Sequence, residues 1–268
     1  MKRISRILGV FLCLFLAFSG TAHAASDAVI DVSNSSEGYF SVNYTESTDT
    51  RMKVGVKYGG NTEYYDYKPG SEVTYSFTEG DGSYTITLYS NISGTTYRPV
   101  TSANVSVNLE NEFAPYLIST TEVTFSEGDE ITKKADSLCS GLSDDASKIV
   151  AIHNFIAGNF KYDYAFAARV RRGIVKSYIP NTAELMNTQR GVCYDFTAVF
   201  AAMCRSQDIP CAVAKGYIDA GYHAWNMVYV DDSWSAVDLT DSITSGVQQV
   251  AALSECTSSM NNYRDYSY

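Results

Sequence analysis

Alternation of apolar and polar residues with a period of two dominates residues 25 to about 110. In Gly38-Tyr39-Phe40-Ser41-Val42-Asn43-Tyr44, the side chains of Phe40, Val42 and Tyr44 would share one face of a strand. Such runs, rich in Tyr, Thr and Val and separated by glycine-containing turns, are typical of half-buried β-strands. About seven short strands would fit in this region. The pattern predicts a small sandwich of the immunoglobulin or fibronectin type III kind over residues 25–112.

Helical spacing replaces this alternation after about residue 113. Ser143-Asp144 can cap a helix whose apolar stripe runs from Ile149 to Phe160, and a second helix is predicted from Cys193 to about Arg205. Helices followed by antiparallel strands predict an α+β domain over residues 113–268. The strand-like segments that follow the second helix are 212–218, 224–230 and 234–239.

The N-terminus has the three parts of a signal peptide. Lys2, Arg3 and Arg6 precede an apolar run from Ile7 to Phe18, and Ala22-His23-Ala24 is a small-x-small cleavage site. The run of about 12 residues is too short to cross a bilayer, which needs about 20. We therefore expect residues 1–24 to be removed, no membrane span afterwards, and a protein that is secreted or otherwise extracytoplasmic, at the cell surface or in the periplasm.

Net charge narrows the set of partners. The full chain carries −10; without Lys2, Arg3 and Arg6, 17 basic residues face 30 acidic ones, which gives −13 for residues 25–268. Such a surface repels phosphate backbones, so nucleic acid is not an expected partner. The chain also lacks a Gly-rich loop ending in Gly-Lys-Ser/Thr, and nothing in it indicates a cofactor.

Five cysteines remain after residue 24, and an odd number in an exported chain leaves at least one thiol without an intramolecular partner. Cys193 begins a predicted amphipathic helix, where unpaired backbone N–H groups stabilise a thiolate. Gly191 would let the backbone approach a substrate closely. Taken alone, a buried structural thiol would be the better interpretation of such a cysteine. The five are Cys139, Cys193, Cys204, Cys211 and Cys256.

Strand geometry predicts that His223 and Asp238 lie close together. If Asp231-Asp232 forms a two-residue hairpin turn, Val230 faces Ser233. Asp238 then faces the residue at position 225, which shares a sheet face with His223. The two side chains become diagonal neighbours, about 7–8 Å apart at the backbone and within reach of one another.

A series of short motifs follows in order along the second half of the chain. They are Lys161-Tyr162-Asp163-Tyr164, Gly191-Val192-Cys193-Tyr194-Asp195-Phe196, Met203-Cys204-Arg205-Ser206-Gln207-Asp208-Ile209-Pro210, Gly216-Tyr217, His223-Ala224-Trp225-Asn226, Trp234 and Asp238. With these motifs in this order, the sequence resembles the core of the transglutaminase-like superfamily over roughly residues 115–245. The resemblance implies a papain-like fold, with a cysteine on a helix that packs on an antiparallel sheet. Leu239 departs from the pattern, because many members have proline after the aspartate.

The resemblance also implies a Cys193–His223–Asp238 catalytic triad. His223 takes the thiol proton, Asp238 orients the imidazole, and the thiolate attacks an amide carbonyl to form a thioester. The backbone N–H of Cys193 would help to hold the oxyanion. Four further residues could add to the oxyanion hole or the substrate cleft, although solvent exposure or core packing explains them equally well: Gln189, Tyr194, Trp225 and Tyr162.

Other polar residues have structural interpretations. His153 is expected to be a structural histidine within a helix. Cys204 and Cys211 are expected to be core thiols or a disulfide, and Cys139 could pair with Cys256. The cysteines have no Cys-x-x-Cys spacing, so a zinc site is not favoured. A basic cluster could contact an acidic substrate such as a cell-wall peptide, but a solvated helix face is the preferred interpretation; it comprises Arg169, Arg171, Arg172 and Lys176.

Two kinds of function remain open at this stage. The favoured one is a secreted thiol enzyme that acts on amide bonds of peptides or proteins, as a cysteine protease or amidase or as a protein-glutamine acyltransferase. The alternative is a cell-surface binding protein, either non-catalytic or attached to its partner covalently through the thiol. In both cases the β-sandwich would be an adhesion, spacer or positioning module.

Overall fold

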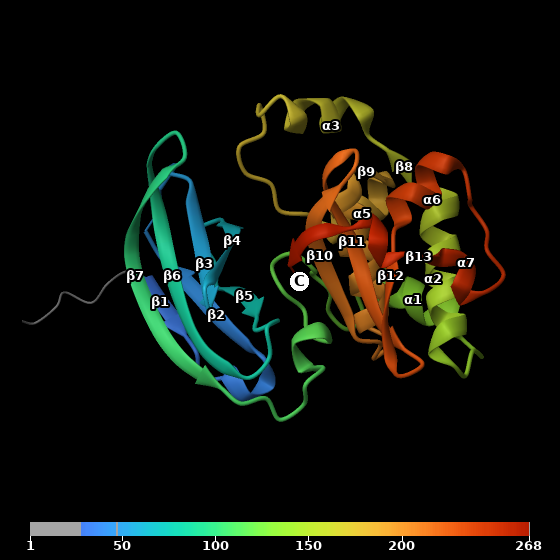
Figure 1. The fold of residues 1–268 in the computed structure, drawn as a ribbon, viewed down its shortest axis with the longest axis horizontal. Helices are drawn as coiled ribbons and strands as arrows, with labels where there is room; N and C mark the ends of the chain where they lie inside the picture. The colour runs from blue at the N-terminus through green and yellow to red at the C-terminus, as the bar shows by residue number, and fades with distance from the viewer. Residues whose placement is uncertain (1–27, 47, 268) are drawn as a thin grey trace, which may run out of the picture.

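The computed structural model describes residues 28–46 and 48–267, in a β-rich N-terminal part and an α+β C-terminal part (Figure 1). The predicted signal peptide, residues 1–24, lies outside these residues. None of the helices in the described ranges combines the length and the apolar character needed to cross a membrane. The expected α+β architecture with a preceding β-region is confirmed.

Two antiparallel sheets form the N-terminal part, and together they have the seven strands expected. One sheet has the order β1-β2-β5 and the other the order β4-β3-β6-β7. Phe40 and Val42 are fully buried between them, as the alternation predicted, and Tyr44 packs at the edge of the same core. The strands are β1 (Ala28–Asp31), β2 (Tyr39–Tyr44), β3 (Met52–Tyr58), β4 (Asn61–Tyr67), β5 (Val73–Ser76), β6 (Gly82–Ser93) and β7 (Thr96–Val107).

A five-stranded antiparallel sheet, ordered β13-β12-β11-β10-β14, forms the base of the C-terminal part. A short parallel pair, β8 and β9, lies beside the start of the central helix α5. The strands are β8 (Lys161–Tyr162), β9 (Arg190–Gly191), β10 (Cys211–Ile218), β11 (Gly221–Val230), β12 (Ser233–Val237), β13 (Thr257–Ser258) and β14 (Arg264–Ser267).

Helices cover one face of this sheet, with further short turns in the linker and the C-terminal segment. The cap predicted before residue 149 is present at the start of α2, since the Asp144 side chain accepts a hydrogen bond from the Ser147 backbone N–H at 2.8 Å. The helices are α1 (Glu130–Cys139), α2 (Asp145–Asn159), α3 (Tyr164–Arg171), α4 (Thr182–Thr188), α5 (Cys193–Arg205), α6 (Leu239–Ser245), α7 (Leu253–Cys256) and the 3₁₀ turns η1 (Ser35–Glu37), η2 (Ala114–Tyr116) and η3 (Met260–Asn262).

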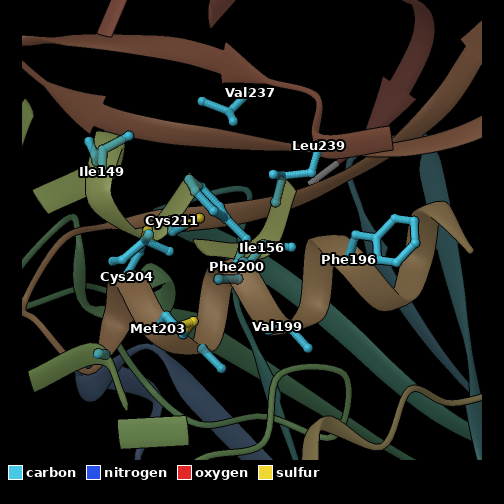
Figure 2. Close-up of a cluster of buried hydrophobic side chains, with 14 of the residues drawn as sticks. Ile149, Ile156, Phe196, Val199, Phe200, Met203, Cys204, Cys211, Val237 and Leu239 are labelled. Atoms are coloured by element: carbon cyan, nitrogen blue, oxygen red, sulfur yellow. The ribbon is translucent and has the colours of Figure 1, made fainter. Parts of the chain in front are cut away.

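Helix α5 is the centre of the main core. Its apolar side chains pack against α1, α2 and α4 and against β10 and β11 (Figure 2). Phe196, Val199, Phe200 and Met203, the stripe that helical periodicity selects, are all fully buried. A helix enclosed on all sides in this way cannot shift without opening the core, so the residue at its N-terminus has a fixed position.

The opposite face of the sheet is covered by the C-terminal segment. Ala214, Trp225 and Met227 line this face, and Tyr263, just before β14, packs on them. Strand β14 extends the sheet by pairing with β10, and β13 pairs with β12. The polar, weakly patterned C-terminal residues therefore form two edge strands of the sheet, which their sequence did not predict.

Candidate active site

Cys193 is the first residue of α5 and is half-buried. The preceding residue, Val192, has an extended backbone, and its N–H donates to Oδ2 of Asp195 at 2.8 Å. This is the second half of a capping box, in which the third helical residue holds the backbone at the helix start. The Cys193 N–H has no acceptor within α5, because that acceptor would lie four residues upstream of the helix. Thiol and free N–H thus occur together at the positive end of the helix dipole.

Gly191 is required here by the side chain of Asp195. A Cβ atom added to Gly191 would lie 2.6 Å from Asp195 Cβ and 2.7 Å from its Oδ2. Such distances are far below van der Waals contact, so only glycine leaves room for the capping carboxylate. The structure thus gives this glycine a structural reason, beside the interpretation from sequence in which it lets the backbone approach a substrate.

His223 and Asp238 face each other across two strands, as the sheet geometry predicted. Val230 pairs with Ser233, and the intervening Asp231 and Asp232 have φ of 52° and 58°, as in a two-residue type I′ turn. Nε2 of His223 lies 2.8 Å from Oδ2 of Asp238. The strand register assumed from the sequence is therefore confirmed.

Asp238 lies at the junction of β12 and α6. Its Oδ1 accepts hydrogen bonds from the backbone N–H groups of Thr240 at 3.0 Å and Asp241 at 3.3 Å, so Asp238 caps α6. The other oxygen remains directed at His223. Leu239 is the first residue of α6, a position where proline is favoured in many helices, so the proline of other members would fit the same helix start.

The imidazole of His223 interacts with Cys193 as well as with Asp238. Burial alone would lower its pKa, but hydrogen bonds to Asp238 and Cys193 and the charges of both raise the pKa of His223 to about 10. The ring is therefore an imidazolium at neutral pH. Since Nε2 bonds the carboxylate, Nδ1 is the nitrogen left for the thiol.

The four residues considered for an oxyanion or substrate role have different surroundings. Trp225 is 1% exposed, stacked between His223 and Tyr263, and its Nε1 has no hydrogen-bond partner among the described residues. Tyr162, on β8, is half-buried against Phe196. Gln189 ends α4 with φ of 50°, and its backbone oxygen accepts from the Lys161 N–H. Tyr194 donates its hydroxyl to Glu122.

A cavity of about 870 Å³ lies between the β-sandwich and the C-terminal part. Tyr194 and Tyr222 line it, and these are the sequence neighbours of Cys193 and His223. Other lining residues, including Glu63 and Tyr64, come from β4 of the sandwich. The two parts of the chain therefore build this cavity together.

The remaining sequence candidates have structural surroundings. His153 is fully buried, bonds Ser242 of α6 at 2.9 Å, and burial lowers its pKa. All five described cysteines are free thiols; Cys204 and Cys211 are fully buried in the core, as one of the two expectations had it. The basic cluster lies on α3 and the loop after it, with exposed side chains at Arg169, Arg171, Arg172 and Lys176.

Three residues near the site carry no signal in the sequence. Glu122, in the linker, accepts the Tyr194 hydroxyl and pairs with Lys215. Tyr178, in the loop before α4, donates to Asp195. Tyr263 covers Trp225 and lies 3.5 Å from Asp238 Oδ2. All three come from segments without periodicity, so only the folded chain brings them to the site.

Comparison with known proteins identifies a family for part of the chain. Residues 132–239 match the sequence model of the Transglutaminase-like superfamily. The C-terminal part of the chain is a transglutaminase-like core. The resemblance drawn from the sequence pieces is thereby confirmed, and the β-rich region precedes this core.

Several known proteins are similar to this chain over part of their length. Human kyphoscoliosis peptidase is 29% identical over 160 residues, which cover 53% of this chain and 23% of that protein. A proposed cysteine protease from Cytophaga hutchinsonii is 17% identical, with 85% of this chain and 87% of that one covered and a TM-score of 0.43. Red sea bream transglutaminase is 11% identical, with 75% and 48% covered and a TM-score of 0.34. The chain thus spans less than a quarter of the length of the human relative.

Proposed function

We propose that this protein is an extracytoplasmic thiol enzyme that acts on amide bonds of peptides or proteins. The observation that carries the proposal is the position of His223, whose imidazole interacts with Asp238 on one side and Cys193 on the other. Cysteine at a helix N-terminus, a histidine and an orienting carboxylate are the parts of a thiol nucleophile system. The transglutaminase-like core supports the same chemistry.

In the proposed mechanism, His223 holds the proton of Cys193 and leaves a thiolate. The thiolate attacks the amide carbon, and the C=O electrons move to oxygen. The Cys193 N–H, which has no acceptor in α5, stabilises this oxyanion. His223 then gives its proton to the departing amine, so that the C–N bond breaks and a thioester remains. Asp238 keeps Nε2 bonded throughout and stabilises the imidazolium.

The acceptor of the acyl group decides between hydrolysis and transfer. Water releases a carboxylate, and a primary amine forms a new amide. We favour the hydrolytic outcome, that is, a peptidase or amidase, and the name of the human relative supports this choice. Removal of the signal peptide predicted over residues 1–24 would leave the enzyme outside the cytoplasm, and this expectation supports a cell-wall peptide as one substrate to examine.

Alkylation by iodoacetamide, followed at each cysteine by peptide mass spectrometry, tests the nucleophile. Cys193 is expected to react faster at pH 7 than the four buried thiols, and His223→Ala should slow this reaction at least tenfold. Cys256→Ala is the matched control. Cys256 is a buried residue on α7, only 5% exposed, and its replacement should leave the Cys193 rate unchanged. A Cys193 rate that is indifferent to His223 would contradict the proposal.

Turnover separates the two outcomes. The protein is incubated with an unstructured protein substrate and a fluorescent primary amine. Fragments without label indicate hydrolysis, and labelled intact substrate indicates transfer. Either activity should vanish in Cys193→Ala and persist in Cys256→Ala. Turnover that survives Cys193→Ala would contradict the assignment of this thiol as the nucleophile.

A further inference from the structure

Each of the two residues that follow Cys193 begins a series of hydrogen bonds and ion pairs that ends in the β-sandwich. Tyr194 donates its hydroxyl to Oε1 of Glu122, and this oxygen is 2.8 Å from Lys215 Nζ. Lys215 is also 3.2 Å from Glu63 Oε1, on β4 of the sandwich. The first path therefore runs from α5 through the linker and β10 to β4.

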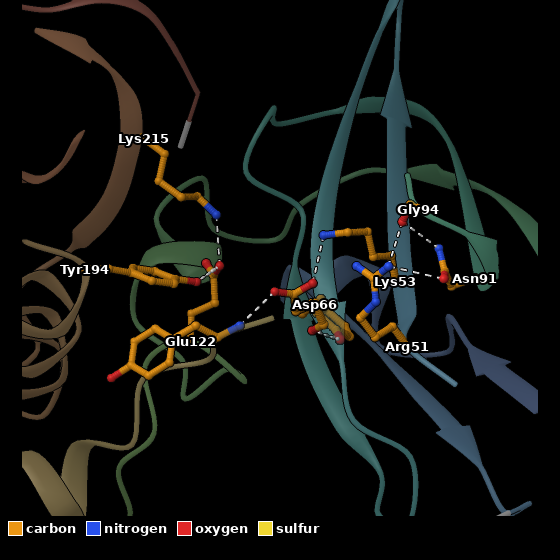
Figure 3. Close-up of polar contacts among 10 residues, drawn as sticks. Arg51, Lys53, Asp66, Asn91, Gly94, Glu122, Tyr194 and Lys215 are labelled. Atoms are coloured by element: carbon orange, nitrogen blue, oxygen red, sulfur yellow. Dashed lines mark hydrogen bonds and ion pairs between the residues drawn. The ribbon is translucent and has the colours of Figure 1, made fainter. Parts of the chain in front are cut away.

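The second path is more direct and passes through Tyr178. The Tyr178 hydroxyl donates to Asp195 Oδ1 at 2.5 Å, and its backbone N–H donates to Asp66 Oδ2 at 3.0 Å. Asp66 is the residue before the end of β4, and its other oxygen pairs with Lys53 at 2.7 Å (Figure 3). One residue thus connects the sandwich to the first turn of the nucleophile helix.

Asp195 depends on this contact because it is almost completely buried. It is 1% exposed, and burial raises the pKa of its carboxyl while the hydrogen bonds from Tyr178 and Val192 act in the opposite direction. A buried carboxylate oxygen without a donor is costly, so loss of the Tyr178 hydroxyl would favour rotation or protonation of Asp195. Rotation releases the N–H of Val192, the residue before Cys193, and protonation weakens the hydrogen bond that this N–H donates.

The hydroxyl and the ring of Tyr178 contact different residues. The ring contacts Phe166 at a centroid distance of 4.8 Å and Tyr194 at 6.5 Å. A phenylalanine would keep both contacts and lose only the hydrogen bond to Asp195. The contribution of the bond can therefore be measured without creating a cavity.

We propose that Tyr178 is a positioning residue through which the β-sandwich holds the first turn of α5, and with it Cys193, in register with His223. The sandwich is then part of the catalytic apparatus in a structural sense, since Asp66 and Glu63 fix the two side chains that follow the nucleophile. This proposal rests on the proposed function for its effect on turnover. The effect on the helix itself is independent of any activity.

Tyr178→Phe in the full chain is the central variant, and Tyr116→Phe is its matched control. Tyr116 also donates its hydroxyl across the interface, to the Thr78 carbonyl at 2.7 Å, and its charge interaction with α5 is with Arg205, at the opposite end of the helix from Cys193. Tyr178→Phe is expected to lower the Cys193 alkylation rate at pH 7 about tenfold, to displace the pH profile of labelling, and to lower kcat with little change in KM. Tyr116→Phe should leave all three at the wild-type value.

A second pair of variants tests the hydrogen bond between Tyr178 and Asp66 of the sandwich. Asp66→Ala removes the acceptor of the Tyr178 N–H and should reproduce the effect of Tyr178→Phe. Lys53→Met removes the ion pair of Asp66 but leaves that acceptor in place, so it should label like the wild type. Equal rates and pH profiles in Tyr178→Phe, Asp66→Ala and the wild type would overturn the proposal.

Amide hydrogen exchange of residues 192–196 keeps this test separate from that of the proposed function. Faster exchange in Tyr178→Phe than in Tyr116→Phe is expected whether or not Cys193 proves to be a nucleophile. Unchanged protection there would overturn the positioning role even in an active enzyme. A wild-type Cys193 that labels slowly, with exchange faster in Tyr178→Phe, would instead contradict the proposed function and retain the positioning role.

Discussion

Tyr263 lies face to face on Trp225, with ring centroids 4.1 Å apart and ring planes inclined by 20°. Trp225 is stacked on its other side against His223, and the Tyr263 hydroxyl is 3.5 Å from Asp238 Oδ2. The C-terminal segment therefore covers the sheet behind two members of the proposed triad. Its contribution is to exclude water from the His223–Asp238 pair and so to strengthen their interaction.

Removal of the Tyr263 ring should destabilise the C-terminal part. Tyr263→Ala is expected to lower the free energy of unfolding by about 3 kcal/mol, because a buried aromatic ring is lost and Trp225 is exposed. Tyr263→Phe keeps the stacking and should cost less than about 1 kcal/mol. The two tryptophans, Trp225 and Trp234, lie on β11 and β12, so urea unfolding followed by tryptophan fluorescence measures this part.

Tyr164→Ala is the control for this measurement, since Tyr164 is 65% exposed at the start of α3. It should change the unfolding free energy by no more than about 0.5 kcal/mol. If Tyr263→Ala proves equally mild, the C-terminal segment does not pack on Trp225 in solution.

The stability of the protein should fall as the pH rises from 6.5 to about 10. His223 has a raised pKa of about 10 in the folded chain, against 6.5 when unfolded. The folded state thus binds the proton more tightly, so the contribution is complete below pH 6.5 and is lost as the pH passes through the folded pKa. The loss should amount to as much as about 4 kcal/mol.

Asp238→Asn supplies the comparison for this pH dependence, because it removes the charge that raises the pKa while it keeps a hydrogen-bond acceptor. Urea unfolding of both proteins at pH 6, 8 and 10 measures the difference. The fall should be much shallower in the variant. Parallel curves would mean that the imidazolium is not held by Asp238.

Gly191→Ala should damage the start of α5 although glycine to alanine is a small change. The new Cβ would lie 2.6 Å from Asp195 Cβ, so Asp195 or the backbone of β9 must shift. Overpacking of this kind costs about 1–3 kcal/mol, and Cys193 should also react more slowly with iodoacetamide. Gly158→Ala is the matched control, because its new Cβ would meet no atom closer than 3.6 Å and it lies within α2. Equal reactivity of the two variants would show that Asp195 is free to move.

Much of this architecture could be predicted because its determinants are local. The stripe of Phe196 and Val199 selects helix α5 and its buried face. The Asp231-Asp232 turn sets the register of β11 and β12, and the register alone brings His223 beside Asp238. Period and turn length are properties of short segments, so the sequence contains them directly.

The supports of the site could not be predicted, because they come from packing between distant segments. Tyr178 and Asp195 are separated by a helix, and Asp66 is 112 residues from Tyr178 along the chain. Tyr263 belongs to a segment whose polar composition indicates no strand, yet β14 forms because β10 offers an open edge. Residues of this kind acquire a role only once the two parts of the chain have docked.

Lys215 offers a last test of that docking, because it is the cation between two carboxylates. Its side chain is 12% exposed, and Glu63 and Glu122 are 20% and 14% exposed. Lys215→Met leaves two neighbouring buried carboxylates without a cation, which should cost about 3–5 kcal/mol at pH 8. Burial and the charge of Glu122 raise the pKa of the Glu63 carboxyl, and Lys215 opposes this rise, so without Lys215 the folded state takes up a proton at Glu63 more readily than the unfolded state. The loss of unfolding free energy in Lys215→Met should therefore shrink as the pH falls toward 5.

Lys53→Met, which breaks the more exposed pair with Asp66, should cost about 1 kcal/mol or less at either pH. If urea unfolding shows the same small cost for both variants, the Lys215 cluster is hydrated and does not hold the sandwich against the transglutaminase-like core.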